Sequence, residues 1–581
     1  MILVVIAGLF ISSCQAPVDQ YKAEADDYAY SAIEKKWDEK FGVKANFKMK
    51  DVEGGEPNIL PEQVIGSDGI LTIPEAMILA TANNRDYQLE KDNLYAKALD
   101  LRLVRHLYEP NPFGIASSTY TDTEDTSNLT TAGTLGFSQL LASGGTISMQ
   151  IGEGWVEMLS GDFRSGLTRL FSATIEQPLL RGAGREVALE QLTQAEQDLL
   201  YQVRSFNHYR RDFVVDVISR YYSILELYEK MNIAEENHNR LDIIDWKTNA
   251  LTEVGKVASH ELEEIEQERM IARDDLILAK SKYRQALDEF KLTLAVAPEM
   301  EFKLDRNEYL ALKTLEPGRL GFTEQQAIET AMALRLDMAN ASDGIIDSER
   351  KVRVAADMTR PALNLVGSVN QQRNPDNTHT AAYSGGATLD IGLDRTIEEM
   401  EYRRALVTLE QSKRNFEERR DTVSLEVRSA LRKLQESYDR YGLQIQARDK
   451  ADKRLENTLL LLHYARANTR DVLRAQKDAY DARNAATDAV VDFAIATLEF
   501  YRDTGVMQVK PDGMWQTTDI ADKKPLPDDL PVEENLPAIE PAEKQLQTEE
   551  TGDPLKIKTT FEDNDQSEIM RILNNISDSL N

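Results

Sequence analysis

The residues of this 581-residue chain that could do chemistry are few and do not converge on one site. Gly182-Ala183-Gly184 forms half of a dinucleotide-binding glycine loop, but the third glycine and the strand–helix–strand context are missing. The six histidines lack the spacing of metal ligands, and no serine lies in a nucleophile elbow. The abundant carboxylates are typical of charged helix surfaces, where solvent and neighbouring cations satisfy them. We therefore expect no enzyme activity, no cofactor and no metal site.

The single cysteine, Cys14, follows an apolar N-terminal segment with small residues directly before the cysteine. An apolar run of about 10 residues is too short to cross a bilayer as a helix. The arrangement resembles the lipobox of bacterial lipoproteins, which implies that residues 1–14 are a lipoprotein signal peptide and that Cys14 carries the lipid. In such proteins Gln15 favours the outer over the inner membrane. The alternative is an unmodified, inert cysteine.

The net charge of −31 argues against a nucleic-acid partner, because phosphate binding needs clustered cations. Part of this charge is local, since residues 511–581 hold 17 Asp and Glu against 6 Lys and Arg, a net charge of −11. We expect residues 508–581 to form an acidic, proline-rich tail that buries no core, with a short helix near 567–573. Residues 15–67 are predicted to be a polar N-terminal extension.

A single shift of 251 residues relates two parts of the chain, which indicates an internal repeat. It pairs Pro110, which ends a predicted helix, with Pro361, and it carries a helix start and a following strand. The other pairs at this shift are Ala76 and Ala327, Ala80 and Ala331, Ala82 and Ala333, Asp86 and Asp337, and Ser117 and Ser368. We assign residues 68–297 to repeat 1 and residues 320–507 to repeat 2, with residues 298–319 as the linker between them.

Each repeat is predicted to contain a helix, a few strands and a long helical hairpin. Pro74 and Glu75 open the first helix, whose apolar positions continue to Leu107. Alternation of apolar with small or polar residues then indicates strands with two unlike faces, and turn residues stand at 143–146 and 374–376. The alternating apolar positions are Leu135, Phe137, Ile147, Met149, Ile151, Phe171, Ala173 and Ile175, then Leu363, Leu365, Val369, Leu389, Ile391 and Leu393.

The strand region of repeat 1 is longer than that of repeat 2. From the helix-ending proline to the arginine after the last strand there are 71 residues in repeat 1 (181 − 110) and 34 in repeat 2 (395 − 361). Repeat 1 therefore has 37 extra residues (71 − 34). We expect them to form extra strand and extracellular loop around residues 135–169, with Trp155 near a membrane interface.

Strands with one apolar and one polar face fit either a soluble sandwich or a membrane barrel. Two observations favour the barrel. Each repeat has few strands, each near the length that crosses a bilayer, and the chain has a lipoprotein-like start. Four to six strands cannot close a barrel alone, and open edges cannot face lipid. Several subunits would therefore share one barrel.

Two long stretches without proline, residues 179–297 and 376–510, are predicted to form long helices that reverse as hairpins. After Arg185 the helical pattern runs for roughly 64 residues, or about 96 Å at 1.5 Å per residue. In the second stretch apolar residues recur at spacings of three, four and seven, as in a coiled coil. They are Leu406, Leu409, Phe416, Val423, Val427, Ala430, Leu434, Tyr438, Tyr441 and Ile445. We interpret this stripe as helix packing.

Three segments carry a resemblance to a known family. They are QPLLRGAGR at 177–185, GKVASHEL at 255–262, and ARANTRDVLRAQ at 465–476, which has alanine where glycine is usual. With the order of the elements, they make residues 68–507 similar to the TolC-like outer-membrane efflux proteins. The fold so implied is mainly α with β: long antiparallel coiled-coil-like helical hairpins, and a few strands contributed to a shared trimeric transmembrane β-barrel.

The resemblance implies a homotrimer whose pooled strands cross the outer membrane and whose helices form a periplasmic tunnel. It also implies two partners, a periplasmic adaptor protein and an inner-membrane transporter. The adaptor contact maps to the helix reversals, at Gly255, Ala465 and Asn468. The periplasmic gate maps to Asp471 and Arg474, where the arginine stands in the place of a second aspartate and could pair with the first.

We expect the chain to be a passive exit duct, the outer-membrane channel-tunnel component of a tripartite efflux or type I secretion system. It would be lipid-anchored in the outer membrane, with its helices in the periplasm. Two other functions remain open. One is a periplasmic coiled-coil scaffold lipoprotein without a conducting barrel, and the other is a membrane-anchored enzyme, which would need a convergent polar site.

Overall fold

The computed structural model describes residues 18–38, 41, 44, 46–48, 59–66, 68–122, 127–160, 166–255, 257–314, 323–374, 378–464, 466–510 and 514–517. All of them belong to one unit, residues 1–525. The predicted lipidation site Cys14, the predicted adaptor residue Ala465, and the helix expected near 567–573 lie outside the described residues.

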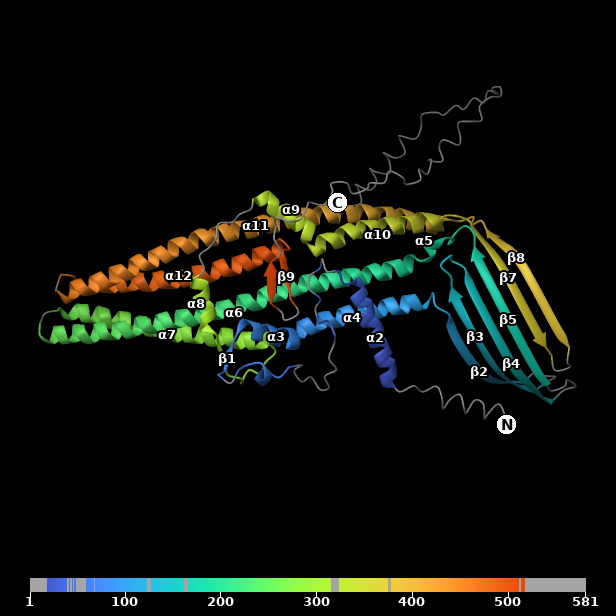
Figure 1. Ribbon diagram of the computed structural model, residues 1–581, viewed down its shortest axis with the longest axis horizontal. Helices are drawn as coiled ribbons and strands as arrows, with labels where there is room; N and C mark the ends of the chain where they lie inside the picture. The colour runs from blue at the N-terminus through green and yellow to red at the C-terminus, as the bar shows by residue number, and fades with distance from the viewer. Residues whose placement is uncertain are drawn as a thin grey trace, which may run out of the picture. The chain divides into compact units, whose positions relative to one another are not determined.

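Helices make up most of the described chain (Figure 1). Four are long and form two antiparallel hairpins, α6 (Glu190–Glu253) with α7 (Ser259–Thr293) and α11 (Thr396–His463) with α12 (Thr469–Asp503). The predicted long helices are thus confirmed, and α6 has 64 residues. The shorter helices are α2 (Val18–Lys36), η3 (Pro61–Gln63), α3 (Ile73–Asn83), α4 (Arg85–His106), α5 (Arg185–Ala188), α8 (Arg306–Thr314), α9 (Glu324–Leu334) and α10 (Leu336–Met358).

The first helix predicted from the sequence is in fact two helices, because the chain breaks at Asn84 between α3 and α4. Asn84 has extended backbone angles (φ −60°, ψ 129°), and its Oδ1 accepts a hydrogen bond from the Tyr87 N–H at 3.0 Å. This bond caps the new helix. The Asn84 Nδ2 also donates to the Thr293 carbonyl at 2.8 Å, which ties the break to the end of α7. The apolar periodicity did not reveal the break because it continues on both sides of Asn84.

The shift of 251 residues reproduces the bounds of several elements. α9 begins and ends 251 residues after α3, and strand β7 (Ala362–Arg373) has the same relation to strand β2 (Asn111–Asp122). Both helices begin with a capping box, in which the N-cap threonine N–H donates to the side chain three residues on, at 2.8 Å in α3 and 2.9 Å in α9. Between α7 and α12 the shift is 210 residues (469 − 259), so the first half holds 41 more residues (251 − 210).

A six-stranded antiparallel sheet has the strand order β2-β3-β4-β5-β7-β8 (Figure 1). Its other strands are β3 (Ser127–Leu140), β4 (Thr146–Ser160), β5 (Gly166–Pro178) and β8 (His379–Asp390). The hairpin turn predicted at 143–146 lies between β3 and β4, where Gly144 has φ +89°. Ile391 and Leu393 were predicted to continue the last strand, but they lie beyond its end because Gly392, with φ +59°, turns the chain towards α11.

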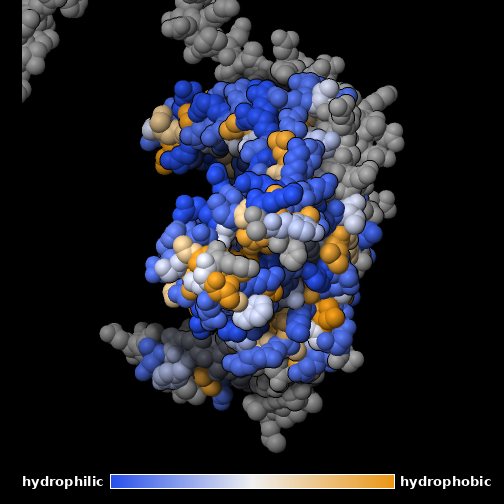
Figure 2. All heavy atoms as spheres, turned by 90° about the vertical axis from the view of Figure 1, so that its left-hand side faces the viewer, coloured by the Kyte–Doolittle hydropathy of each residue, from blue (hydrophilic) through white to orange (hydrophobic). Residues whose placement is uncertain are grey.

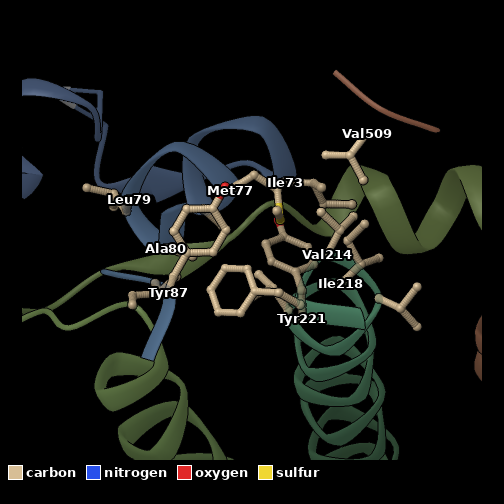
Figure 3. Packing of buried hydrophobic residues seen from close by; sticks show 14 of the residues in the cluster. Ile73, Met77, Leu79, Ala80, Tyr87, Val214, Ile218, Tyr221 and Val509 are labelled. Carbon is tan, nitrogen blue, oxygen red and sulfur yellow. The ribbon is translucent and has the colours of Figure 1, made fainter. Parts of the chain in front are cut away.

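The main hydrophobic core lies where α3, α4 and α6 meet (Figure 3). Tyr221 of α6 is fully buried in it, and its hydroxyl donates to the Leu71 carbonyl at 2.8 Å and accepts the Asp305 N–H at 3.0 Å. These two residues belong to or flank a short parallel pair, β1 (Ile70–Leu71) with β6 (Lys303–Leu304). One buried hydroxyl therefore ties the segment between the two halves of the chain to the longest helix of the first half.

The apolar stripe predicted on α11 packs against neighbouring helices. Val423, Val427 and Leu434 are buried, and they cluster with Ala331 of α9 and Phe500 of α12. The interpretation of the stripe as helix packing is confirmed at these positions.

Part of the N-terminal extension is a packed helix. Ile33 of α2 is buried in the main core, and the Tyr95 hydroxyl of α4 donates to Asp26 of α2 at 2.7 Å. At the other end of the described chain, β9 (Met507–Val509) and β10 (Trp515–Thr517) pair as a small antiparallel sheet. The polar composition of the two ends did not reveal either of these packed segments.

Candidate functional site

The six-stranded sheet has two faces of different polarity, as the alternation predicted. Strand pairing places Leu135 opposite Ile151, and Ile151 opposite Phe171, so these side chains share one face. This apolar face carries Ala116, Leu135, Phe137, Ile147, Met149, Ile151, Phe171, Ala173, Ile175, Leu365, Val369, Tyr383 and Leu389. The other face is mainly polar and carries Ser117, Thr119, Thr130, Thr134, Ser148, Gln150, Ser172, Thr174, Asn364, Ser368, Asn370, Ser384 and Thr388.

Charged groups interrupt the apolar face towards the end of the sheet that is farther from the helices. The Arg169 Nε donates to Glu153 Oε1 at 2.9 Å across β4 and β5. Trp155 stands two residues beyond Glu153 on the same face, opposite Leu167, and is 42% exposed. Trp155 thus lies beside the transition from apolar to charged side chains, where tryptophan is enriched in membrane proteins.

The turn between sheet and helix explains the glycine loop noted in the sequence. Gly182 and Gly184 have φ of 77° and 97°, which only glycine adopts readily, and the Gly182 N–H donates to Asp357 Oδ2 at 2.7 Å. Next to them, the Arg181 guanidinium lies 3.8 Å from Asp390 Oδ2 and 3.7 Å from a carboxylate oxygen of α11. The segment joins strand β5 to α5 and to the end of β8, and its glycines serve this junction.

The first helix reversal is built around Gly255, between α6 and α7. Gly255 has φ +74°, in the left-handed region, and its N–H donates to the Thr252 carbonyl at 2.9 Å. A Cβ at this position would meet no atom within 4 Å. The sequence therefore placed this predicted contact residue correctly in the turn.

At the second reversal, Asn468 caps α12, and Asp471 completes the cap. The Asn468 Oδ1 accepts the Asp471 N–H at 2.9 Å, and Asp471 Oδ2 accepts the Asn468 N–H at 3.4 Å. The carboxylate of Asp471 therefore serves the helix N-terminus. In the described chain it makes no ion pair with Arg474, so the pairing that the sequence suggested is absent within one subunit.

Arg470, which the sequence did not single out, links the two reversals. Its guanidinium donates from both Nε and Nη2 to the Glu264 carboxylate, at 3.2 Å each. Hydrogen bonding to Glu264 raises the pKa of the Arg470 guanidinium. Buried Val472 of α12 and Ile265 of α7 belong to one apolar cluster beside this pair. The two partners are 206 residues apart in the chain, so only the structure brings them together.

Polar contacts join α6 to α12 along their length. The Lys230 Nζ lies 2.8 Å from Glu226 and 2.6 Å from Asp488. Burial raises the pKa of the Glu226 carboxyl, and the nearby Lys230 opposes this effect. Farther along, the Gln476 Nε2 donates to Asn237 Oδ1 at 2.8 Å, with both side chains buried. Contacts of this kind fix one alignment of the two hairpins.

Seen from the side of the reversals, the described surface is mainly hydrophilic, with separate hydrophobic patches (Figure 2). Val254 and Tyr464, which flank the two turns, are 67% and 65% exposed. Trp246, two turns of helix before the first reversal, is 71% exposed.

The described residues contain no group of three or more His, Cys, Asp and Glu side chains that could hold a metal ion. Many carboxylates instead pair between helices, as when Arg483 binds Glu236 at 2.9 Å and Asp452 at 2.8 Å. In the same part of the chain, no helix is both long enough and apolar enough to cross a bilayer.

No family model and no curated protein matches this sequence, but solved structures match its fold. The chain is similar to the outer-membrane channel OprN over 80% of its own length and 96% of that protein, with a TM-score of 0.55 and 12% identity. The match to the CmeC outer membrane channel of Campylobacter jejuni covers 83% of this chain and 93% of that protein, with a TM-score of 0.54 and 15% identity. The fold is that of outer-membrane channels. The match to the open state of the MtrE outer membrane channel of Neisseria gonorrhoeae covers 81% of this chain and 96% of that protein, with a TM-score of 0.55 and 14% identity.

At these identities the likeness concerns the fold alone, and it confirms the mainly helical fold with an antiparallel sheet to which the sequence resemblance pointed. Each match spans more than nine-tenths of the channel structure and at least 80% of this chain. We therefore interpret the two-faced sheet and the helix reversals by comparison with these channels.

Proposed function

We propose that this chain is the subunit of an outer-membrane channel-tunnel, a passive exit duct for efflux or type I secretion. The observation that carries the proposal is the two-faced sheet, joined to two long helical hairpins in a fold shared with outer-membrane channels. A polar face towards a lumen and an apolar face towards lipid would give each side chain a suitable environment. The strands have 12 to 15 residues, enough to cross a bilayer when tilted.

A barrel shared by several copies follows from the open edges of the sheet. Among the described strands, β2 and β8 each pair on one side only. Their remaining backbone N–H and C=O groups cannot face lipid unpaired. We infer a homotrimer whose strands are pooled into one barrel and whose helices form a tunnel in the periplasm, with Cys14 as the lipid anchor at the outer membrane.

The helix reversals are the proposed docking place of a periplasmic adaptor, which would connect the duct to an inner-membrane transporter. Gly255 and Asn468 belong to the two turns, and Ala465 falls between α11 and α12 in the sequence. Partner helices dock well in grooves between antiparallel helices. The exposed side chains of Val254 and Tyr464 add apolar contact area beside these turns.

Asp471 and Arg474, together with the pair formed by Arg470 and Glu264, are the proposed periplasmic gate. Three copies around one axis would collect these charges into a ring, and acidic positions in such a ring favour cations. The cap on α12 supports this role because it holds the Asp471 carboxylate in a fixed place.

Extraction of the full-length protein from outer-membrane fractions tests the proposal. A trimer that needs detergent and dissociates on heating supports the duct. A periplasmic scaffold lipoprotein would behave as a soluble monomer once its lipid is removed, and that result would reject the shared barrel.

A further inference from the structure

We propose that the hairpin β3–β4 is part of the channel wall, so that three copies close a barrel of eighteen strands in which β8 of each copy pairs with β2 of the next. The inference rests on the proposed function, since it takes the trimeric channel as its starting point. It adds that a second copy of this chain pairs with each edge of the sheet, and it adds the width of the lumen.

The hairpin is bonded into the sheet along almost its full length. β3 pairs with all twelve residues of β2, and β4 pairs with β5 over eleven residues. Leaving the wall would break both of these ladders at once, and it would expose their backbone groups. In the second half of the chain β7 is followed directly by β8, so the hairpin accounts for most of the 41 extra residues of the first half (251 − 210).

The two faces of the hairpin continue the faces of the neighbouring strand. Phe137 and Met149 lie beside Ala173 on the apolar face, and Ser148 lies beside Thr174 on the polar face. A hairpin folded into the lumen would bring its apolar face into water. A hairpin folded outward would bring its polar face into lipid.

The two edges of the sheet are complementary to each other. β2 begins on the helix side, shortly after α4, and β8 ends on the helix side, shortly before α11, so the two edges run antiparallel at the same level. Both strands have 12 residues, which are almost all exposed, whereas those of β3 are mostly half-buried.

The devices that usually block a sheet edge are nearly absent from these two strands. Neither β2 nor β8 contains a lysine, and their ladders with β3 and β7 show no register shift. The two strands contain one proline, Pro112, which is the second residue of β2. The sheet has an even number of strands, and each strand runs antiparallel to its neighbours. Copies joined edge to edge therefore also meet in antiparallel pairs.

The hairpin changes the width of the exit. Eighteen strands spaced about 4.8 Å apart and tilted by about 40° enclose a barrel about 36 Å across between backbones. Without the hairpin each copy would give four strands, and the barrel would be about 24 Å across by the same geometry. Barrels of roughly 16 to 18 strands leave an aqueous channel, so the outer end of this duct should be wide and water-filled.

Cysteine labelling of the assembled, full-length protein tests the position of β4. In the wall, Ser148→Cys and Gln150→Cys face the lumen and should react with a membrane-impermeant maleimide at least tenfold faster than Met149→Cys, which faces lipid. Ser368→Cys and Val369→Cys supply the matched control on β7, which pairs with β5 and β8 whatever the hairpin does. The same alternation on both strands supports the proposal.

Two other labelling results separate the inference from the function on which it rests. Equal reaction of Ser148→Cys and Met149→Cys, with alternation kept on β7, would overturn the eighteen-stranded wall and leave the channel in place. Loss of alternation on both strands would reject the channel as well.

Disulfide cross-linking tests the pairing of the two edges. Ser117→Cys on the polar face of β2 is combined in turn with Ala382→Cys, Ser384→Cys and Gly386→Cys, which share the polar face of β8. At least one combination should give covalent oligomers that stop at three subunits, and Tyr383→Cys on the opposite face should give none. Monomers in all three same-face combinations, or a product that stops at another number, would overturn the closure.

Discussion

At the scale of single residues, Gly255 can matter to a partner without mattering to the packing. Its φ of +74° disfavours any L side chain by about 1 kcal/mol, but a Cβ there would meet no atom within 4 Å. We therefore expect Gly255→Phe to abolish export and adaptor binding while the trimer stays intact, because bulk is added at the proposed docking turn. Export assays, co-purification of the adaptor and detergent gels measure these three properties.

Gly255→Ala is the matched control, since it adds the same backbone strain with little bulk. It should retain export. A complete loss of export in this variant would make the backbone conformation, not docking, responsible, and loss of the trimer would make the residue structural.

Arg470 and Asp471 are proposed to have different roles at the second helix reversal, Arg470 in channel opening and Asp471 in cation selectivity. Arg470→Gln removes the pair with Glu264 and should raise the open probability of single channels in planar bilayers by roughly a few-fold, because exposed ion pairs are weak. Asp471→Asn keeps a side-chain oxygen for the helix cap, so it should weaken cation selectivity with little change in open probability. Arg474→Gln removes a cation from the same turn and should strengthen cation selectivity.

These three variants can also disprove the gate. If open probability and selectivity are unchanged in all of them, the charged groups of this turn do not control conduction.

At the scale of secondary-structure elements, a partly buried charge network holds α10 to α11. Asp337 Oδ2 accepts hydrogen bonds from Arg335 Nη2 at 2.7 Å and from Arg419 Nε at 2.9 Å, and Arg335 Nη1 also donates to Glu426 at 2.6 Å. Burial by itself would raise the pKa of the Asp337 carboxyl, but the hydrogen bonds and charges of the two arginines hold it well below its ordinary value.

Because the folded pKa of Asp337 is lowered, its contribution to stability is present above about pH 4 and is lost as the pH falls. Asp337→Asn should lower the free energy of unfolding by about 2 kcal/mol at pH 7, since the buried Arg335 and the half-buried Arg419 lose a charged partner. The difference from the native chain should shrink below about pH 4. Thermal unfolding in detergent, followed by helical circular dichroism at pH 7 and pH 3, measures it.

Asp421→Asn is the control for the network, because the Asp421 side chain lies on α11 near Arg419 in the chain and is 79% exposed. It should change the melting temperature little at either pH. A destabilisation by Asp337→Asn that is equal at pH 7 and pH 3 would contradict the assigned role of the carboxylate.

The connections of the sheet predict its orientation in the membrane. The turn between β3 and β4 lies on the helix side, where the Gly184 N–H donates to the Ser143 carbonyl at 3.2 Å. β4 ends and β5 begins at the opposite end of the sheet, and the sequence between these strands, residues 161–165, contains Arg164. Trypsin added to intact cells should therefore cleave after Arg164 and leave the helices intact, and Arg164→Gln should resist. Cleavage confined to the helical segments would reverse the topology.

Local patterns in the sequence predicted the elements better than their contacts. Alternation placed Leu135 and Ile151 on one face, because a period of two is a local property of the chain. The resemblance to the family, and not a local pattern, placed Gly255 in a helix reversal, and the structure has it in the turn between α6 and α7. The break at Asn84 was missed because apolar positions continue through it, and the pairing of Arg470 was missed because it depends on how two distant hairpins align.

At the scale of the whole molecule, the proposed duct would be a property of the assembly and not of one chain. One copy offers an open-edged sheet with an apolar face and two helical hairpins with exposed apolar side chains near their turns. Each of these surfaces is suited to lipid or to another protein chain. Conduction should therefore appear only when copies assemble in a membrane.

Reconstitution of the purified, full-length protein into planar lipid bilayers measures this most directly. A channel-tunnel subunit should give stepwise ion currents, with one conducting unit for every three chains. A protein that is monomeric without detergent, or a detergent-solubilised trimer that carries no current under any applied voltage, would contradict the assignment of this chain as an exit duct.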